Sequence, residues 1–320
     1  MALVGVAALA LTIDRSGEAG PDPAGVAGPT TPATVADLDP RPATRPPGVA
    51  SRTRAHFPDA GTTGVPEGVT LTRSGAVAVH EDGAVIENLF IVDGEIEVYA
   101  NDVTIRNVRI TNDQAFVQWG IAQRSGFSGL VVEDSEIYGN PDSPHQFASG
   151  ISNHGGMITV RRVEVHTVTD GILTSHGIIE DNYLHSPRYF EDDHTDMIQS
   201  VGGSPIGLPL EIRNNTIINT ESQTAAVFLS SGTGTGDIPI HNVLVEGNLL
   251  AGGGYTIYGG GSVAEGADPA DIVIRDNLFS RDIFPDSGYY GPVAHFDPSA
   301  PGNVWEGNLW EDDRTPVRVS

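Results

Sequence analysis

The sequence contains no cysteine and no lysine, because all 17 of its basic residues are arginine. Without cysteine the chain can form no disulfide and no thiolate zinc site. Without lysine it cannot form a lysine Schiff base, bind phosphate through a Walker-type lysine or use a lysine as general base. Several classes of enzyme are therefore excluded, including every lyase that depends on lysine.

Positive charge is scarce as well, since 42 acidic residues against 17 basic ones give a formal net charge of -25. An acidic surface repels phosphate backbones, so we expect no nucleic-acid partner. It would also repel an acidic polysaccharide unless a cation lay between the two. Aromatic residues make up only 7% of the chain, whereas 39 glycines and 22 prolines are typical of short strands joined by turns.

The N-terminal region differs in composition from the rest. Residues 1–13 are apolar and too few to span a bilayer, which is typical of the core of a signal peptide, although a buried strand or helix is the alternative. Residues 14–56, rich in proline, alanine, glycine and threonine, read as a disordered linker. We therefore expect residues 57–320 to form one monomeric domain, secreted, extracellular or held at the cell surface, with no stable membrane span.

A strand pattern recurs along this domain about every 20 to 30 residues. Each copy alternates apolar and polar residues and then reaches a turn, which predicts a short strand with one buried face. The turn residues of the successive copies are Asn88, Asn107, Asp134, Arg162, Asp181, Asn214, Gly247, Asp276 and Gly307. Asparagine tolerates the left-handed backbone that such turns need. No helical stretch separates the copies, so the pattern predicts a solenoid of parallel strands, with an irregular β-sandwich as the alternative.

The repeat resembles that of the pectate-lyase-like superfamily, in the segments NDVTIRNVRI, GIIEDNYLH, LEIRNNTII and IVIRDNLFS. The resemblance covers about residues 80 to 310. It implies an all-β fold, a single-stranded right-handed parallel β-helix of roughly nine to ten coils. It says little about chemistry, because the superfamily includes lyases, hydrolases, epimerases and non-catalytic adhesins.

A second recurring strand precedes each copy and carries the candidate chemistry. Aligning its isoleucines places Asp170 and Asp196 at equivalent positions of adjacent coils, about 4.8 Å apart. Paired carboxylates at this spacing suit an acid and a base whose pKa values are pushed apart, or a shared cation. The segment HSPRYFEDDHTD, which ends at Asp196, adds histidine, arginine and further acids, with a solvated acidic loop as the alternative.

These patterns predict two sets of site residues. The predicted catalytic residues are Asp170, Asp196, His194, His176 and Arg188. The predicted substrate-binding residues are His154, Tyr189, Gln199 and Trp119. A histidine beside carboxylates can act as general acid or base near neutral pH, and tryptophan can stack on a sugar.

The resemblance implies two further interpretations. Thr169–Asp170–Gly171 resembles the Asn-Thr-Asp motif of polygalacturonases, and Asp192–Asp193 or Asp196 could stand for the aspartate pair that follows it; the Arg-Ile-Lys element has no counterpart. Pectate lyases bind Ca²⁺ through acids and use an arginine as base. That pattern implies Arg188 as base and Ca²⁺ bound by Asp170, Asp193 and Asp196, with no other cofactor expected.

We therefore expect an exported enzyme that cleaves a polysaccharide, as a lyase or a glycoside hydrolase, with an Asp/His cluster in a groove along the helix. A carboxyl separation of about 5 Å would favour retaining hydrolysis or metal binding, and one of about 6.5 to 9.5 Å inverting hydrolysis. The alternative is a non-catalytic β-helix that binds glycans or acts as a surface adhesin.

Overall fold

The structure is a computed structural model that describes residues 52–115, 118–191, 193–231, 238–261 and 269–319. The predicted leader, most of the predicted linker and Asp192 lie outside these residues. The described chain is nearly all β-strand, and its one helical element is the 3₁₀ helix η3 (Arg54–His56). Among the described residues, no helix is long and apolar enough to cross a membrane.

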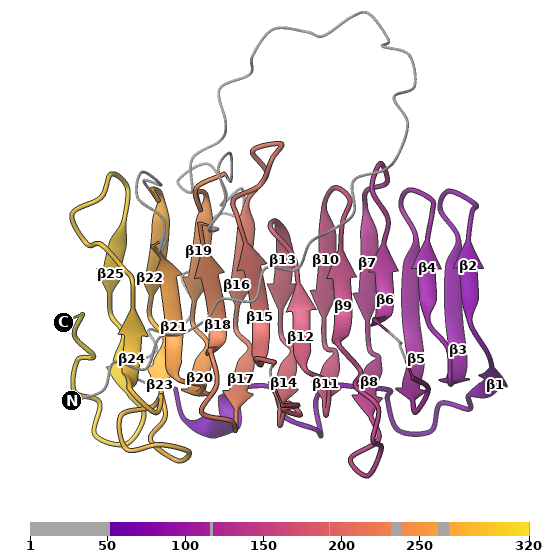
Figure 1. Ribbon diagram of the computed structural model, residues 1–320, viewed down its shortest axis with the longest axis horizontal. Helices are drawn as coiled ribbons and strands as arrows, with labels where there is room; N and C mark the ends of the chain where they lie inside the picture. The colour runs from indigo at the N-terminus through magenta and orange to yellow at the C-terminus, as the bar shows by residue number, and fades with distance from the viewer. Residues whose placement is uncertain (1–51, 116–117, 192, 232–237, 262–268, 320) are drawn as a thin grey trace, which may run out of the picture. The chain divides into compact units, whose positions relative to one another are not determined.

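Two sheets of parallel strands make up the fold (Figure 1). The nine-stranded sheet consists of β2 (Val77–Val79), β4 (Ile96–Val98), β6 (Trp119–Gln123), β9 (Ser149–Asn153), β12 (Asp170–Leu173), β15 (Asp196–Val201), β18 (Ala225–Ser230), β21 (Tyr255–Gly260) and β24 (Gly291–Ala294). The 17-stranded sheet consists of β1 (Thr72–Ser74), β3 (Val85–Val92), β5 (Thr104–Asn112), β7 (Leu130–Glu133), β8 (Glu136–Gly139), β10 (Ile158–Arg161), β11 (Glu164–His166), β13 (Gly177–Glu180), β14 (Tyr183–His185), β16 (Leu210–Arg213), β17 (Thr216–Asn219), β19 (Val243–Glu246), β20 (Leu249–Gly252), β22 (Ile272–Arg275), β23 (Leu278–Phe279), β25 (Val304–Glu306) and β26 (Leu309–Trp310).

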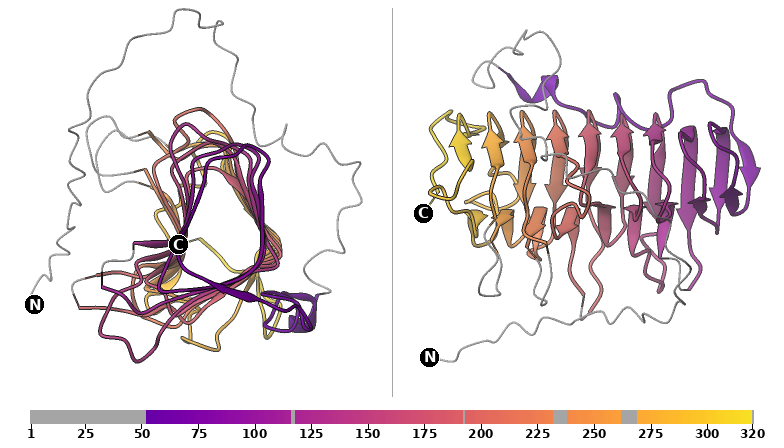
Figure 2. Two further views of the ribbon diagram at one scale, coloured as in Figure 1. Left: turned by 90° about the vertical axis from the view of Figure 1, so that its right-hand side faces the viewer. Right: turned by 90° about the horizontal axis from the view of Figure 1, so that it is seen from above.

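The larger sheet contains two columns of strands, because the long strand β5 pairs with β7 through its first half and with β8 through its second. Together with the nine-stranded sheet these columns surround one core, as the view along the stack shows (Figure 2). Each circuit of the chain, here called a coil, adds strands to the columns. The all-β, parallel arrangement agrees with the sequence prediction and is consistent with a parallel β-helix or solenoid.

The turn residues aligned by sequence adopt the predicted backbone. All nine are left-handed, with φ between 49° and 66°. Asparagine, aspartate and glycine reach this region at little cost, whereas arginine does not. Arg162 is the one arginine among them, and its Nε donates to Asp134 Oδ1 on the preceding coil at 2.7 Å. The ion pair holds the side chain of this residue against the neighbouring turn.

The core is a stack of aliphatic side chains in register. One such column consists of Ile105, Val132, Val160, Ile179, Ile212, Val245 and Ile274. Each of these side chains is fully buried, which contributes roughly 1.5–3 kcal/mol per side chain. The sheets thus hold successive coils at a fixed spacing.

A buried asparagine ladder follows the turns of the later coils and consists of Asn182, Asn215, Asn248, Asn277 and Asn308. The Nδ2 of Asn215, for example, donates to Asn248 Oδ1 at 3.0 Å and to the carbonyl of Ile179 at 2.9 Å. Its Oδ1 accepts the backbone N–H of Asn182 at 2.9 Å. The ladder therefore satisfies backbone groups that the turns would otherwise leave buried without a partner.

Residues 52–64, here called the strap, cross several coils of the 17-stranded sheet. Phe57 is 4% exposed and packs with Leu249 and Leu278. Further along the strap, the carbonyl of Pro58 accepts from Thr216 Oγ1 at 2.6 Å, and the N–H of Gly64 donates to the carbonyl of Arg162 at 3.0 Å. The strap therefore ties later coils to earlier ones.

Candidate active site

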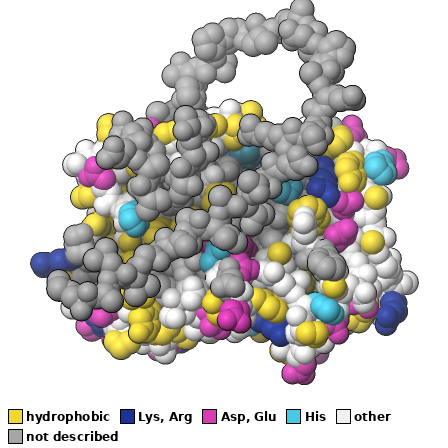
Figure 3. All heavy atoms as spheres, in the orientation of Figure 1, with side chains coloured by type: hydrophobic (Ala, Val, Ile, Leu, Met, Phe, Trp, Pro, Cys, Tyr) yellow, Lys and Arg dark blue, Asp and Glu magenta, His cyan; other side chains and the backbone are white. Residues whose placement is uncertain are grey.

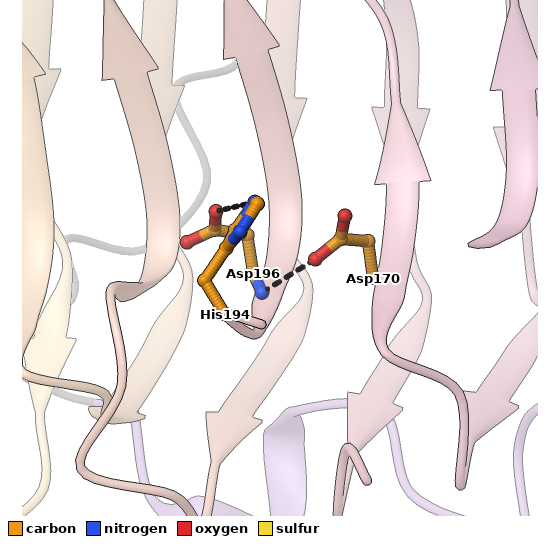
Figure 4. A group of neighbouring side chains, drawn as sticks. All are labelled: Asp170, His194 and Asp196. Carbon is orange, nitrogen blue, oxygen red and sulfur yellow. Dashed lines mark hydrogen bonds and ion pairs between the residues drawn. The ribbon is translucent and has the colours of Figure 1, made fainter. Parts of the chain in front are cut away.

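The first two predicted catalytic residues begin adjacent strands of the nine-stranded sheet. Asp170 is the first residue of β12 and Asp196 the first residue of β15, and the register pairs Ile172 with Ile198 as the sequence alignment predicts. His194 precedes Asp196 by two residues. One ligand atom from each of Asp170, His194 and Asp196 lies within 4.8 Å of the others (Figure 4). We call these three residues the Asp/His cluster.

Both aspartates also cap the next strand. Asp170 Oδ1 accepts the backbone N–H of Asp196 at 2.9 Å, and Asp196 Oδ1 accepts the backbone N–H of Ala225 at 2.9 Å. The second oxygen of Asp196 accepts from Gln199 Nε2 at 3.0 Å. These bonds orient both carboxyls through Oδ1, so the backbone bonds to the next strand do not occupy Oδ2 of Asp170 or of Asp196.

His194 is the most exposed member of the cluster. Its side chain is 47% exposed, whereas that of Asp196 is 0% exposed. Its Nδ1 lies 3.3 Å from Asp193 Oδ1, and its Nε2 lies 3.7 Å from Asp196 Oδ2. Acidic and histidine side chains lie next to one another on the visible part of the molecular surface in Figure 3. Of the cluster, only His194 and the partly exposed Asp170 can meet a large substrate.

The environment separates the pKa values of these acids. Burial raises the pKa of Asp170 to about 7, although the His194 charge opposes the shift. Burial, and then the charge of Asp170, raises the pKa of Asp196 well above its usual range. Asp193 moves the other way, because hydrogen bonds from the ring and backbone of His194 outweigh its partial burial and lower its pKa. The hydrogen bond to Asp193 raises the pKa of His194 to about 9, against the effect of burial.

At neutral pH these shifts make His194 a cation and Asp193 an anion, and they favour a proton in the Asp170/Asp196 pair. Gln199 Nε2 lies 2.8 Å from His194 Nε2. A protonated imidazole donates through Nε2 and therefore needs an acceptor at this position. Rotating the side-chain amide of Gln199 by half a turn exchanges its nitrogen and oxygen, which places the acceptor Oε1 opposite His194 Nε2. The same oxygen would then face Oδ2 of Asp196, where a protonated carboxyl can donate.

The cluster does not fit the expected Ca²⁺ site. Ca²⁺ takes six to eight oxygen ligands, whereas this group offers two carboxylates and one imidazole nitrogen. The Gln199 amide also lies within 3.0 Å of both His194 Nε2 and Asp196 Oδ2. Asp193, the third expected ligand, is not in the group and pairs with His194 instead. An imidazole with carboxylates is a donor set more typical of zinc and other transition metals.

The remaining two predicted catalytic residues have structural partners elsewhere. His176 follows the opposite end of β12, is 4% exposed, and places Nε2 2.9 Å from the carbonyl oxygen of Gly155. Arg188 donates to the carbonyls of Asn140, at 2.6 Å, and Ser143. A guanidinium that donates to two carbonyls is stabilised as the cation, which opposes a role as the base.

The predicted substrate-binding residues are divided among different places. Gln199 contacts the cluster, and Tyr189 is 39% exposed in the preceding loop. Trp119 lies two strands before Asp170 in the same position of the sheet, where both align with Ser149. Its ring packs against His154, with centroids 5.4 Å apart. Trp119 and His154 therefore form a separate group on the same sheet.

Three residues that contact the site or align with it were not among the predicted site residues, namely Gln146, Phe228 and Tyr258. Gln146 Nε2 donates to Asp193 Oδ2 and, at 3.1 Å, to Thr169 Oγ1. Phe228 and Tyr258 align with Gln199 on the two strands that follow. The two rings could have been found, because each comes directly after the core aliphatic residue of its strand, whereas the Gln146 contact joins two irregular loops.

Comparisons with known protein families, with curated proteins and with solved structures found nothing that matches this chain.

Proposed function

We propose that this protein is an exported enzyme that hydrolyses a polysaccharide, built on the right-handed parallel β-helix of the pectate-lyase-like superfamily with roughly nine to ten coils. The observation that carries the proposal is the convergence of Asp170, His194 and Asp196 from adjacent strands to within 4.8 Å of one another. Shifted pKa values alone would not indicate catalysis, because structural ion pairs also shift them. Here buried carboxyls lie beside an exposed histidine, and this combination is typical of catalytic sites.

The different pKa values of Asp170 and Asp193 indicate which acid donates a proton in the proposed reaction and which accepts one. Asp170, with a pKa raised to about 7, keeps a proton that it can give to the glycosidic oxygen as the bond to the anomeric carbon breaks. Asp193, with a lowered pKa, remains ionised and takes the proton of the water that attacks this carbon. Proton transfers balance, since one proton leaves Asp170 and one arrives at Asp193.

Asp196 acts as a positioning residue in this proposal. Its short separation from Asp170 resembles that in retaining enzymes, in which the second carboxylate attacks the sugar directly. However, its side chain is 0% exposed, so it has no access to an anomeric carbon. Its effect is electrostatic, because a second carboxyl in a low-dielectric site favours a proton within the pair.

Hydrolysis is favoured over elimination. A lyase must neutralise the uronate carboxyl beside the carbon that loses its proton. At the cluster the described cation is His194, which already pairs with Asp193, and Arg188 donates to backbone carbonyls. The site and the overall charge of -25 therefore favour a neutral glycan.

A non-catalytic glycan-binding module or adhesin is the second candidate. The capping bonds favour it, since Asp170 and Asp196 both have a structural reason to occupy the starts of their strands. On this alternative the raised pKa values would be a side effect of burial, and glycan would bind without being cleaved.

Incubation of the full chain with neutral and uronic polysaccharides distinguishes the candidates. New reducing ends without the ultraviolet absorbance of unsaturated uronate would support hydrolysis, and new absorbance would indicate a lyase. Asp170→Asn should slow cleavage by about 10²–10⁴-fold. The matched control is Asp82→Asn, because Asp82 Oδ1 likewise accepts a backbone N–H of the next coil, that of Asn101 at 2.7 Å. Binding without cleavage would favour the module.

A further inference from the structure

Aromatic side chains continue the line of the active site on the later coils. Gln199 aligns with Phe228, and Phe228 with Tyr258, on successive strands of the nine-stranded sheet. The ring centroids of Phe228 and Tyr258 are 5.2 Å apart, and those of Tyr258 and His295 are 5.4 Å apart with the rings nearly parallel. Tyr255 packs against Tyr258, and Tyr290 packs against Tyr255. We call Phe228, Tyr255, Tyr258, Tyr290 and His295 the aromatic strip.

The strip is accessible from solvent. Tyr290 is 67% exposed and His295 is also exposed, whereas Phe228, Tyr255 and Tyr258 are partly buried. Tyr255 lies 5.7 Å from both Tyr258 and Tyr290 between ring centroids, so the rings support one another. Partial burial of this kind fixes the rings and leaves part of their surface free to contact a ligand.

The strip also lacks the arginines that accompany rings elsewhere. In the described part of the chain, the rings that lie under a guanidinium are Phe57, Tyr99, Trp119, Phe190 and Trp310. None of them belongs to the strip. Burial raises the pKa of Tyr258, so its phenol stays neutral at physiological pH. A polyanionic ligand on these rings would therefore have no arginine above them to neutralise its charge. An uncharged ligand needs no such neutralisation.

We infer that the aromatic strip binds the part of a neutral polysaccharide that extends from the Asp/His cluster toward the later coils, with about one sugar unit per strand. The inference rests on the proposed function. Neighbouring strands lie about 4.8 Å apart, close to the length of one sugar unit in an extended glycan. The apolar faces of sugars stack on aromatic rings, so a row of rings at this spacing can hold successive units.

A similar column on the other sheet offers a matched control. Tyr138, His166 and His185 align on β8, β11 and β14, and Tyr138 stacks on His166 at 5.2 Å, much as Tyr258 stacks on His295. There, however, His185 Nε2 lies 3.2 Å from Glu164 Oε1, and acids accompany the rings. This column belongs to the 17-stranded sheet and not to the sheet that carries the aromatic strip, so its tyrosine should not contribute to glycan binding.

The test measures binding in the full chain carrying Asp170→Asn, with a soluble β-glucan, a xylan and polygalacturonate as probes. Adding Tyr258→Ala should weaken binding of the neutral glycan that binds best by about tenfold, whereas Tyr258→Phe, which keeps the ring, should not. Tyr138→Ala should leave binding unchanged. Melting temperatures of all variants show whether each has kept its fold.

The outcomes separate the inference from the proposed function. If the wild-type protein cleaves a glycan but Tyr258→Ala binds it as well as its parent does, the strip has no role and the hydrolase proposal stands. If nothing is cleaved but a neutral glycan binds in a manner that depends on Tyr258, the hydrolase proposal fails and the strip stands. Preferred binding of polygalacturonate, or no binding of any probe, would overturn the inference.

Discussion

Asp170 Oδ1 accepts the backbone N–H of Asp196 at 2.9 Å, so one carboxylate of the candidate active site holds the backbone of the other. The bond occupies one oxygen of Asp170 and leaves Oδ2 to carry the proton that the proposed mechanism needs. Structural and catalytic roles can therefore be separated within a single side chain.

Replacement of Asp170 by asparagine and by alanine should separate these roles. Both variants should lose about 10²–10⁴-fold in rate of glycan cleavage, because neither can donate the acidic proton. Asparagine retains Oδ1 as an acceptor, whereas alanine leaves the N–H of Asp196 without it. Alanine should therefore lower the free energy of unfolding by about 1–3 kcal/mol relative to asparagine, measured by chemical denaturation. Equal stability of the two variants would argue against the capping role.

The rate of cleavage should depend on pH in a defined direction. Activity needs Asp170 protonated, so the rate should fall as pH rises through about 7. It should also fall in acid, below the ordinary pKa of 3.8 for aspartate, where Asp193 with its lowered pKa becomes protonated. The measurement is kcat/KM across the pH range in which the protein stays folded.

Replacing His194 by glutamine should move both limbs of that profile to higher pH. The charge of His194 lowers the pKa of both Asp170 and Asp193, so its removal raises both values. A uniform loss of rate with unchanged limbs would mean that His194 contacts substrate and does not tune the acids.

The same raised pKa should make the fold less stable as pH rises. The pKa of Asp170 is 3.8 without the protein environment and about 7 in the fold, so the folded state binds the proton more tightly. This contribution to stability is fully present below about pH 3.8 and is lost as pH rises to about 7. Asp170→Asn should therefore flatten the dependence of unfolding free energy on pH, measured by chemical denaturation at several pH values.

Removing one side chain from the asparagine ladder should destabilise the fold. Asn215→Ala leaves the N–H of Asn182 and the carbonyl of Ile179 buried without their present partner. We expect a loss of about 2–5 kcal/mol, measured by denaturant unfolding. Asn140→Ala is the control, since the Nδ2 of Asn140 bonds an exposed acid, Asp113, at 3.2 Å. A similar small effect at both positions would contradict the ladder's role.

The sequence predicted the parts of this structure that repeat. Alternation with period 2 revealed the strands, and left-handed turns were predictable because asparagine, aspartate and glycine tolerate them. The adjacency of Asp170 and Asp196 followed from register, since equivalent residues of neighbouring parallel strands lie one strand apart. Prediction from pattern succeeds where each coil imposes its geometry on the next.

The parts that escaped prediction lie in irregular segments. The contact of Gln146 with Asp193, the carbonyl partners of Arg188 and the path of the strap all join residues with no periodic relation. The conformation of such a loop depends on many weak contacts and not on a repeated rule. The carbonyl partners of Arg188 could therefore not be predicted from the sequence, although its segment does adjoin the site.

The asparagine ladder keeps the same geometry while the chain between its members changes length. Successive asparagines from Asn182 to Asn308 are 33, 33, 29 and 31 residues apart, yet each Nδ2-to-Oδ1 distance is 2.9 or 3.0 Å. Insertions therefore accumulate outside the sheets without disturbing their register. For protein engineering, the scaffold should accept foreign loops beside β12 and β15, so that substrate preference can be redesigned without redesigning the fold.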